Sequence, residues 1–451
     1  MRCAALVRCA GAVLWLPAAA WAAEPDIAGV LPTSIGLPEV NAVLRPGAGS
    51  SPYAGVDSFG SPFVNLRFVF DTGASGVVLF EGPAQALAIP VAQHGGSDVV
   101  FADVGVGGAT TFLVSDPVHV SIGSFVQDPP DPYTTDAAYP RESPDVRLQL
   151  GPPGSAALFL SDFSQHGIVG VPEMLGRVSV VLPKLAEVSF FELTPADTIH
   201  THVYAPGVPP ETGPGIPSAD VHVELTLKSF DRFTQTTPAG ATGPTLGTNP
   251  FVGPDPLAAL EGVSPLPTSP PGITVRFGTG AATGSFLLDT GNQTTSISTA
   301  MAAQLGVRYQ QPGDPGYDPA GPPMLVHAAD ASLVADQFSA AFAGIGGTVT
   351  IAGFYADSLL VRTMEGDPLD DGDPAHLRFA SAPVFVQDIE LLDPVTMDTF
   401  TFEGILGTNY LFASGDLSAL AGFVVPFRAG PFEALVLDLA APTPTLGLAF
   451  E

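Results

Sequence analysis

The sequence predicts an all-β protein whose two halves repeat one arrangement of strands and turns. Glycine and proline are abundant, with 50 and 47 copies in 451 residues. Short segments of alternating apolar and polar residues recur, as in 221–227, whereas long helical patterns are few. The tripeptide Asp-Thr-Gly occurs twice, at 71–73 and 289–291, each time directly after an apolar run. These observations favour two β-rich units of one design.

The first 22 residues have the composition of a secretory signal peptide. Arg2 and Arg8 precede an apolar stretch from 10 to 20, and residues 20–22 supply a small-any-small cleavage pattern. Both cysteines and both tryptophans lie in this segment, so we expect a mature chain without disulfides, held by core burial. No later segment reaches the ~20 uninterrupted apolar residues of a membrane span. We expect an exported protein, secreted or periplasmic, with no membrane partner.

The formal net charge of −30 arises from scarce basic residues, since charged residues are only 13% of the chain, against about 25% in ordinary domains. Nucleic-acid binding needs clustered Lys and Arg to neutralise phosphates, so the composition argues against that class. A low-pH setting and a general solubility bias both fit this charge. The working pH therefore stays open.

The first two features shared by the halves are a strand and a short helix on either side of each Asp-Thr-Gly turn. The strands carry alternating apolar residues, Val64, Leu66, Phe68 and Phe70 in one half and Ile273, Val275 and Phe277 in the other, where a Gly-rich hairpin at 278–284 follows. The predicted helices are 84–89, between Pro83 and Pro90, and 299–305, between Ser298 and Gly306.

The other two shared features are rich in glycine. Each half has a glycine-rich β segment, 105–113 and 344–351, whose glycines permit a hairpin tip. Each half then has an apolar pair flanked by glycines, at 167–170 and 404–407. An ordinary hairpin explains either glycine-rich segment alone, so the evidence lies in the matched order of all four features.

This repeat divides the chain into four parts. After the signal peptide at 1–22 we expect an N-terminal lobe at 23–205, a Pro- and Gly-rich connector at 206–270 that contributes an interlobe strand, and a C-terminal lobe at 271–451. The stretch from Glu24 to about Gly60 has an irregular pattern. Arg45 is its only basic residue, so it does not resemble a basic inhibitory pro-segment.

The two turns and the apolar pairs resemble those of the pepsin-like aspartic peptidases, and each half is similar to a retropepsin-like module. The resemblance covers most of the mature chain and implies two β lobes with a cleft between them. It implies that Asp71 and Asp289 form a catalytic pair that holds a water at the lobe interface. Two carboxyl groups about 3 Å apart share one proton and activate water without a metal, so no cofactor is expected.

The resemblance also implies supporting roles. Thr72 and Thr290 brace the turns by hydroxyl hydrogen bonds across a pseudo-twofold axis, while Gly73 and Gly291 let backbone N–H groups approach the carboxylates. The apolar pairs Ile168-Val169 and Ile405-Leu406 thread beneath the turns, Gly170 and Gly407 allow close passage, and the hairpin of Gly105, Val106, Gly107 and Gly108 is the flap over the substrate.

Two features depart from the pepsin-like pattern. Ser or Thr usually follows the glycine of each turn and helps to hydrogen-bond the carboxylate, but Ala74 and Asn292 stand there. The flap candidate also lacks the typical tyrosine. Alanine is usual in the retropepsin module, whereas Asn292 supports the alternative of an inactive pepsin-fold protein that serves as a secreted binding or surface protein. A third reading has two modules that dimerise with other chains.

Other chemistries have weaker support. His200 and His202 share one strand face without the further ligands of a zinc site. The acidic loop at 367–373 does not match the EF-hand spacing. No Gly-x-Ser-x-Gly elbow occurs, and the expected mature chain has no cysteine nucleophile. We predict a monomeric aspartic endopeptidase, without a metal, that cleaves polypeptides bound in extended conformation.

Overall fold

The computed structural model describes most of the chain from Ile27 to Phe450, and for some strand residues it describes the backbone alone. The signal-peptide prediction at 1–22 and the hairpin tip at Val106 and Gly107 lie outside the described residues. The described residues are 27–450 except 35–36, 57–59, 61, 75, 106–107, 125–140, 152–164, 184–186, 190–198, 204–217, 230–232, 237–244, 248–264, 271, 345–346, 389, 393–398, 413–423 and 427–430.

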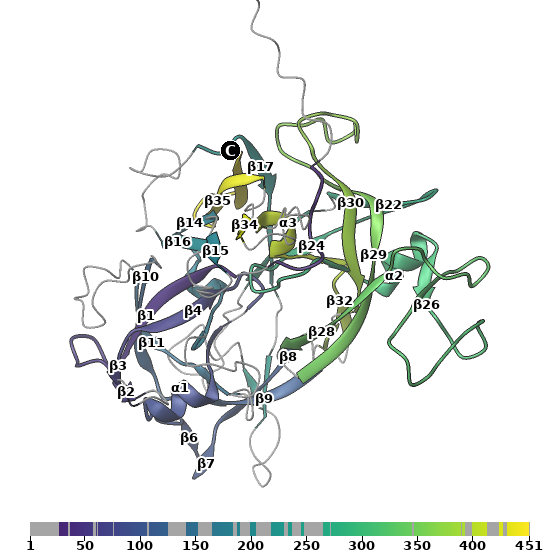
Figure 1. Cartoon of the computed structure of the whole chain (residues 1–451). Coiled ribbons are helices and arrows are strands. Elements are labelled where there is room, and N and C mark those ends of the chain that lie inside the picture. Colours follow the sequence, from purple (N-terminus) through teal and green to yellow (C-terminus); the bar gives the residue numbers. More distant parts are fainter. Residues whose placement is uncertain are drawn as a thin grey trace, which may run out of the picture.

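Strands dominate the described residues, which confirms the all-β prediction, and two large sheets hold most of them (Figure 1). The first sheet has eleven strands in the order β11 (Arg141–Val146), β10 (Val118–Ser124), β1 (Glu39–Arg45), β4 (Leu66–Phe70), β13 (Gly167–Val169), β5 (Val77–Leu79), β12 (Gln149–Leu150), β9 (Gly108–Val114), β8 (Val100–Gly105), β19 (Phe233–Thr236) and β20 (Thr245–Gly247).

The second sheet has ten strands and comes from the connector and the second half of the chain. Its order is β18 (Thr226–Ser229), β21 (Pro265–Thr268), β24 (Phe286–Leu288), β33 (Gly404–Leu406), β25 (Ser296–Ile297), β30 (Leu377–Val386), β29 (Gly347–Val361), β22 (Ile273–Phe277) and β23 (Gly280–Gly284), with β28 (Phe338–Gly344) also paired to β29.

The internal repeat predicted from the sequence is present in the strand order. The series β4-β13-β5-β12-β9-β8 in the first sheet matches β24-β33-β25-β30-β29-β28 in the second. In each series the short second strand, β13 or β33, runs parallel to the strand before the Asp-Thr-Gly turn and antiparallel to the strand after it. The two sheets lie on opposite sides of Figure 1.

A smaller sheet of five strands joins the halves. Its order is β16 (Ile199–Val203), β14 (Val178–Pro183), β35 (Phe432–Asp438), β36 (Thr445–Phe450) and β17 (Val221–Glu224). Within it β14 of the first half pairs with β35 near the end of the chain. The other strands form pairs: β2 (Gly55–Val56) with β3 (Pro62–Phe63), β6 (Gln93–His94) with β7 (Ser97–Asp98), β15 (Glu187–Ser189) with β34 (Val424–Pro426), β26 (Val307–Tyr309) with β27 (Leu325–His327), and β31 (Glu390–Leu392) with β32 (Thr399–Thr401).

The helices after the turns differ in how well the sequence predicts them. Helix α2 (Thr299–Gln304) begins as expected, because the Ser298 side chain accepts a hydrogen bond from the Met301 N–H group. Helix α1 is Glu81–Ala86 and not 84–89 as expected. Pro83 lies in its first turn, where the missing N–H group has no intrahelical partner to lose, so the helix starts before this proline.

Two other expectations for the backbone are wrong. The stretch 24–60 is not irregular throughout, since it contains β1, a central strand with every residue buried. The expected strand at 221–227 is divided at Leu225, because β17 pairs with β36 whereas β18 pairs with β21 of the second sheet. The connector thus contributes strands to all three larger sheets.

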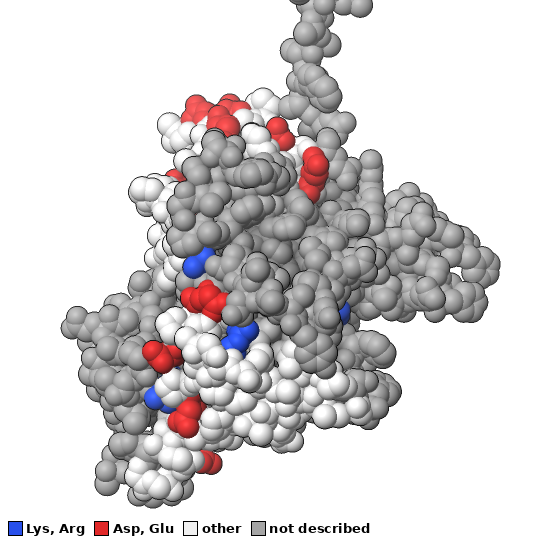
Figure 2. All heavy atoms as spheres, turned by 90° about the vertical axis from the view of Figure 1, so that its left-hand side faces the viewer, with Lys and Arg blue, Asp and Glu red and all other residues white. Residues whose placement is uncertain are grey.

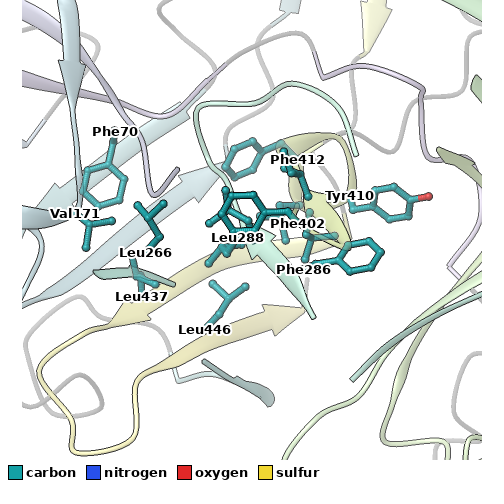
Figure 3. Packing of buried hydrophobic residues seen from close by; sticks show 14 of the residues in the cluster. Phe70, Val171, Leu266, Phe286, Leu288, Phe402, Tyr410, Phe412, Leu437 and Leu446 are labelled. Atoms are coloured by element: carbon teal, nitrogen blue, oxygen red, sulfur yellow. The ribbon is translucent and has the colours of Figure 1, made fainter. Parts of the chain in front are cut away.

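One apolar core lies beneath both Asp-Thr-Gly turns. Phe70 and Leu288, which immediately precede the two aspartates, are each 2% exposed and belong to the same buried cluster. Leu266 and Leu437 lie between them in Figure 3. Burial of each such side chain stabilises the fold by about 1.5–3 kcal/mol. The core therefore fixes the strand ends from which the two turns project.

Candidate active site

The two Asp-Thr-Gly turns meet through their threonines. The Thr72 hydroxyl donates to the backbone oxygen of Leu288 at 2.6 Å, and the Thr290 hydroxyl donates to that of Phe70 at 2.6 Å. In return each hydroxyl accepts a hydrogen bond of 3.0 Å from the backbone N–H group of the other threonine. Both threonines are buried. The contacts are reciprocal, as a twofold relation between the halves requires.

Glycine at the third position lets each turn approach the carboxyl group of the other. A Cβ atom built on Gly73 would lie 2.5 Å from Cγ of Asp289, and one built on Gly291 would lie 2.2 Å from Cγ of Asp71. Real Cβ atoms do not make contacts this short. The space that a larger residue would fill is occupied by the carboxyl groups themselves.

The two carboxyl groups are hydrogen-bonded to each other and to backbone N–H groups. Gly73 N–H donates to Oδ1 of Asp71 at 2.7 Å, and Gly291 N–H donates to Oδ1 of Asp289 at 3.0 Å. Burial raises the pKa of Asp71, although hydrogen bonds, the largest from Asp289, oppose the rise. Burial and then the charge of Asp71 raise the pKa of Asp289 well above its ordinary value. Such a pair binds one proton more readily than two isolated aspartates.

The apolar pairs lie where they support the turns. Strand β13, with Ile168 and Val169, runs between β4 and β5, and β33, with Ile405 and Leu406, runs between β24 and β25. The backbone N–H groups of Asp71 and Asp289 donate to the oxygens of Val169 and Leu406 at 3.0 and 3.1 Å. These matched bonds fix the start of each turn.

Gly170 and Gly407 follow the apolar pairs at points of close backbone approach. A Cβ atom on Gly170 would lie 2.4 Å from the Gly76 oxygen, and one on Gly407 would lie 2.0 Å from the Thr294 oxygen. The obstacle is backbone in both cases, so a side chain cannot be accommodated by a change of rotamer. Only glycine fits these positions in this backbone.

Asn292 and Ala74, the residues that follow the glycines, act on the carboxyl groups through the backbone. Their N–H groups donate to the backbone oxygens of Asp289 and Asp71 at 3.3 and 3.4 Å, and they oppose the rise that burial gives the pKa of each carboxyl. The Asn292 side-chain oxygen accepts from the N–H group and hydroxyl of Thr294 at 3.0 and 2.9 Å. Asn292 therefore closes its own turn, and Asp289 keeps the same backbone relation to it that Asp71 has to Ala74.

The glycine-rich segments form hairpins at matched places in the two sheets. Strands β8 and β9 pair from Val100 with Leu113 to Gly105 with Gly108. Strands β28 and β29 pair from Phe338 with Gly353 to Gly344 with Gly347. The strands of the flap candidate are thus present, and its tip residues Val106 and Gly107 lie outside the described residues.

The acidic loop at 367–373 is held by arginines and by its own backbone. The Asp371 carboxylate is paired with Arg276 and Arg362 at 2.7 and 2.5 Å, and these contacts lower its pKa against the effect of burial. The Asp367, Asp370 and Asp373 side chains accept from backbone N–H groups within the loop. In the described part of the chain no cluster of three or more His, Cys, Asp or Glu side chains could hold a metal ion.

Three further observations concern the histidine pair, the charged surface and membrane spans. His200 and His202 lie on β16, and their side chains are outside the described part. On the face shown in Figure 2 the basic side chains lie singly, and acidic side chains lie near most of them. Among the described helices none is long and apolar enough to span a bilayer.

Three residues near the Asp289 turn were not predicted. The Ser34 hydroxyl lies 2.6 Å from the Thr408 hydroxyl, and the Asn409 side chain donates to the Leu31 oxygen at 3.1 Å. Thr408 and Asn409 directly follow Gly407, so their position was a usable signal. Ser34 offered none, since 374 residues separate it from Thr408.

No protein-family model matches this chain, and no curated protein sequence matches it.

Proposed function

We propose that this protein is an exported aspartic endopeptidase with a two-lobed, pepsin-like fold. The observation that carries the proposal is the meeting of Asp71 and Asp289, each against the glycine of the opposite turn. The two halves contribute one carboxyl each through the same strand, turn and underlying apolar segment. A buried carboxyl pair of this kind is the arrangement that activates water for peptide hydrolysis.

The chemistry follows from the shared proton. The ionised carboxyl takes a proton from water as the water oxygen attacks the scissile carbonyl carbon, while the protonated carboxyl donates toward the developing oxyanion. The carboxyl that took the water proton then donates it to the leaving nitrogen as the C–N bond breaks, and the other carboxylate takes back a proton from a hydroxyl of the tetrahedral intermediate, which restores the pair. Both carboxyls are needed, because one must be ionised and the other protonated at the same moment.

The hairpin β8–β9 indicates the substrate class, and the origin of both carboxyls in one chain indicates the oligomeric state. An extended polypeptide adds backbone hydrogen bonds to a strand edge, as in β-augmentation, and the hairpin β8–β9 is the candidate flap for this role. Both carboxyls come from one chain, so the proposed enzyme is active as a monomer. No cofactor takes part in the proposed reaction.

The test uses residues 23–451, an unfolded polypeptide substrate and three variants. Asp71→Asn and Asp289→Asn should each abolish cleavage between acidic and neutral pH, while the wild type cleaves. Asp336→Asn is a matched control, because Asp336 is exposed and its φ of +51° is a conformation that asparagine tolerates. Full cleavage by either dyad variant would contradict the proposal.

Inhibitor binding separates the peptidase from the inactive binding protein that Asn292 suggested. A pepstatin-type transition-state mimic requires a formed carboxyl dyad. We expect saturable binding by the wild type and weak binding by Asp289→Asn. A folded wild type that neither binds the mimic nor cleaves polypeptide would favour the inactive protein.

A further inference from the structure

The segment Ile27–Ser34, here called the N-terminal arm, lies on the second half of the chain although it precedes the first. Ile27 forms a parallel bridge with Phe379 of β30, and its N–H group donates to the Arg378 oxygen at 2.8 Å. Val30 is 5% exposed and belongs to the main core. The next strand, β1, pairs with β4 of the first sheet. The arm therefore ties the two halves together.

Ser34 fastens the end of the arm to the turn that carries Asp289. Its N–H group donates to the Gln293 oxygen at 2.8 Å, and its hydroxyl lies 2.6 Å from the Thr408 hydroxyl. The Thr408 hydroxyl donates to the Asn292 oxygen at 3.0 Å. Since that bond uses the one hydroxyl proton of Thr408, Ser34 is the donor between the two hydroxyls.

This chain of hydrogen bonds reaches the proposed dyad in one more step. The Asn292 backbone oxygen also accepts from the Thr408 N–H group at 2.8 Å, and the Asn292 N–H group donates to the backbone oxygen of Asp289 at 3.3 Å. The same N–H group opposes the rise that burial gives the pKa of the Asp289 carboxyl. Asn409 makes a second connection: its side chain donates to the Leu31 oxygen and accepts from the Thr295 hydroxyl at 2.8 Å. Arm, helix α3 (Thr408–Phe412) and turn form one buried polar network.

The first half uses a different device at the equivalent place. Val171 follows Gly170 as Thr408 follows Gly407, and its N–H group donates to the Ala74 oxygen at 3.0 Å. Its side chain is fully buried in the apolar core and has no hydroxyl. The backbone bond is thus common to both halves, whereas the hydroxyl bonds to the arm belong to the Asp289 turn alone.

We propose that Ser34 and Thr408 are positioning residues for Asp289, through which the docked N-terminal arm holds the turn 289–294 in its active geometry. This inference rests on the proposed peptidase function. Neither residue touches the carboxyl group, so each acts through Asn292. Loss of either hydroxyl removes one buried hydrogen bond from this network, which is enough to loosen the turn.

The experiment compares Thr408→Val, Thr408→Ser, Ser34→Ala and the double variant Ser34→Ala/Thr408→Val in residues 23–451. Thr408→Val keeps the shape and copies Val171, while Thr408→Ser keeps the hydroxyl. We expect Thr408→Val and Ser34→Ala to lower kcat/KM about two- to tenfold and to speed hydrogen exchange at 289–294. Thr408→Ser should keep both kcat/KM and hydrogen exchange at 289–294 close to those of the wild type. The double variant should lose less catalytic free energy than the sum of the losses in the two single variants.

Ser50→Ala is the matched control, because Ser50 is exposed and lies outside the arm. The inference is overturned if Thr408→Val folds with unchanged hydrogen exchange at 289–294 and an unchanged kcat/KM. If the wild type cleaves nothing, the proposed function fails instead. Hydrogen exchange still reports whether the arm controls the turn, so the two failures are distinguishable.

Discussion

Thr72 and Thr290 exchange two hydrogen bonds across the internal repeat, each from the backbone N–H group of one to the hydroxyl of the other. Their hydroxyls donate two more to the backbone oxygens of Leu288 and Phe70 in the opposite half. Each hydroxyl donates one hydrogen bond and accepts another, and both partners lie in the opposite half of the chain. Each threonine therefore joins its own turn to the strand and turn of the other half. Because 218 residues separate the two threonines, this contact fixes the position of one half against the other at the carboxyl pair.

Removal of one hydroxyl from this contact should destabilise the fold. Thr72→Val keeps the side-chain shape but leaves the Leu288 oxygen and the Thr290 N–H group without their partner. We expect the free energy of unfolding to fall by about 1–3 kcal/mol, measured by urea denaturation. Thr72→Ser should retain most of it, because it keeps the hydroxyl. Equal stability of Thr72→Val and wild type would show that the contact contributes little.

A methyl group at Gly73 should disturb catalysis more than folding. The new Cβ would lie 2.5 Å from Cγ of Asp289, so the carboxyl must move by about 1 Å, a misplacement that can cost about 100-fold in rate. We expect Gly73→Ala to fold and to lose cleavage and pepstatin-type binding. Gly82→Ala is the control, because no atom lies within 4 Å of its Cβ position.

A methyl group at Gly170 should act on folding instead. Its Cβ would meet the backbone oxygens of Gly76 and Ala74 at 2.4 and 2.5 Å, and backbone cannot move aside without breaking the sheet. We expect Gly170→Ala to yield little folded protein, measured as soluble yield and thermal unfolding. A folded, fully active Gly170→Ala variant would show that β13 can shift beneath the first turn.

The partly buried ring of His166 should make the fold less stable in acid. Its Nδ1 accepts a hydrogen bond of 3.0 Å from the backbone N–H group of Arg67. Burial of the ring, and then the charge of the Arg67 side chain, lower the pKa of His166 to about 4. The unfolded chain has a histidine pKa near 6.5, so it binds more protons between these values. Stability is present above about pH 6.5 and falls as the pH drops toward 4.

A variant isolates this effect from the titration of carboxylates. The loss from His166 is at most about 3 kcal/mol, and smaller because the ring is partly exposed. His166→Gln cannot take up the proton, so its free energy of unfolding should fall less between pH 7 and pH 4.5 than that of the wild type. Parallel pH curves for the two proteins would exclude a role for His166.

A hydroxyl beside the first aspartate should shift the acid side of the activity profile. Burial raises the pKa of Asp71, and Ala74 offers it only a backbone N–H group. Ala74→Ser adds a donor that stabilises the ionised carboxyl and so lowers the pKa of the pair. The proposed reaction needs one ionised carboxyl, so the acidic limb of kcat/KM should move to lower pH. A shift to higher pH would contradict this reasoning.

The parts of the fold that follow from local chemistry were predictable from the sequence. The Asp-Thr-Gly turns, the Ser298 cap and the glycine hairpins are each specified by a few adjacent residues, and their repetition indicated two equivalent halves. The site residues that belong to this repeat, namely the two turns and the apolar pairs with their glycines, could therefore be predicted. The close approaches at Gly73 and Gly291 needed only the assumption that the two turns face each other.

The missed parts depend on contacts between distant residues. Strand β1 contains Glu39, Asn41 and Arg45 and lies in the stretch 24–60, whose sequence pattern is irregular. In the structure these side chains are buried, and Arg45 donates to the Ser121 hydroxyl at 2.6 Å. The N-terminal arm was missed for the same reason, because its partners on β30 and α3 lie more than 300 residues away.

The pairing of β14 with β35 sets the order in which a newly made chain can become competent. Strand β14 ends at Pro183 and β35 begins only at Phe432, and contacts across such a separation form late because a long loop must close first. A nascent chain of which only the first half has been made contains Asp71 but lacks the turn that carries Asp289. In the proposed enzyme, hydrolytic capacity therefore arises only after β35 of the second half has been made and has paired with β14.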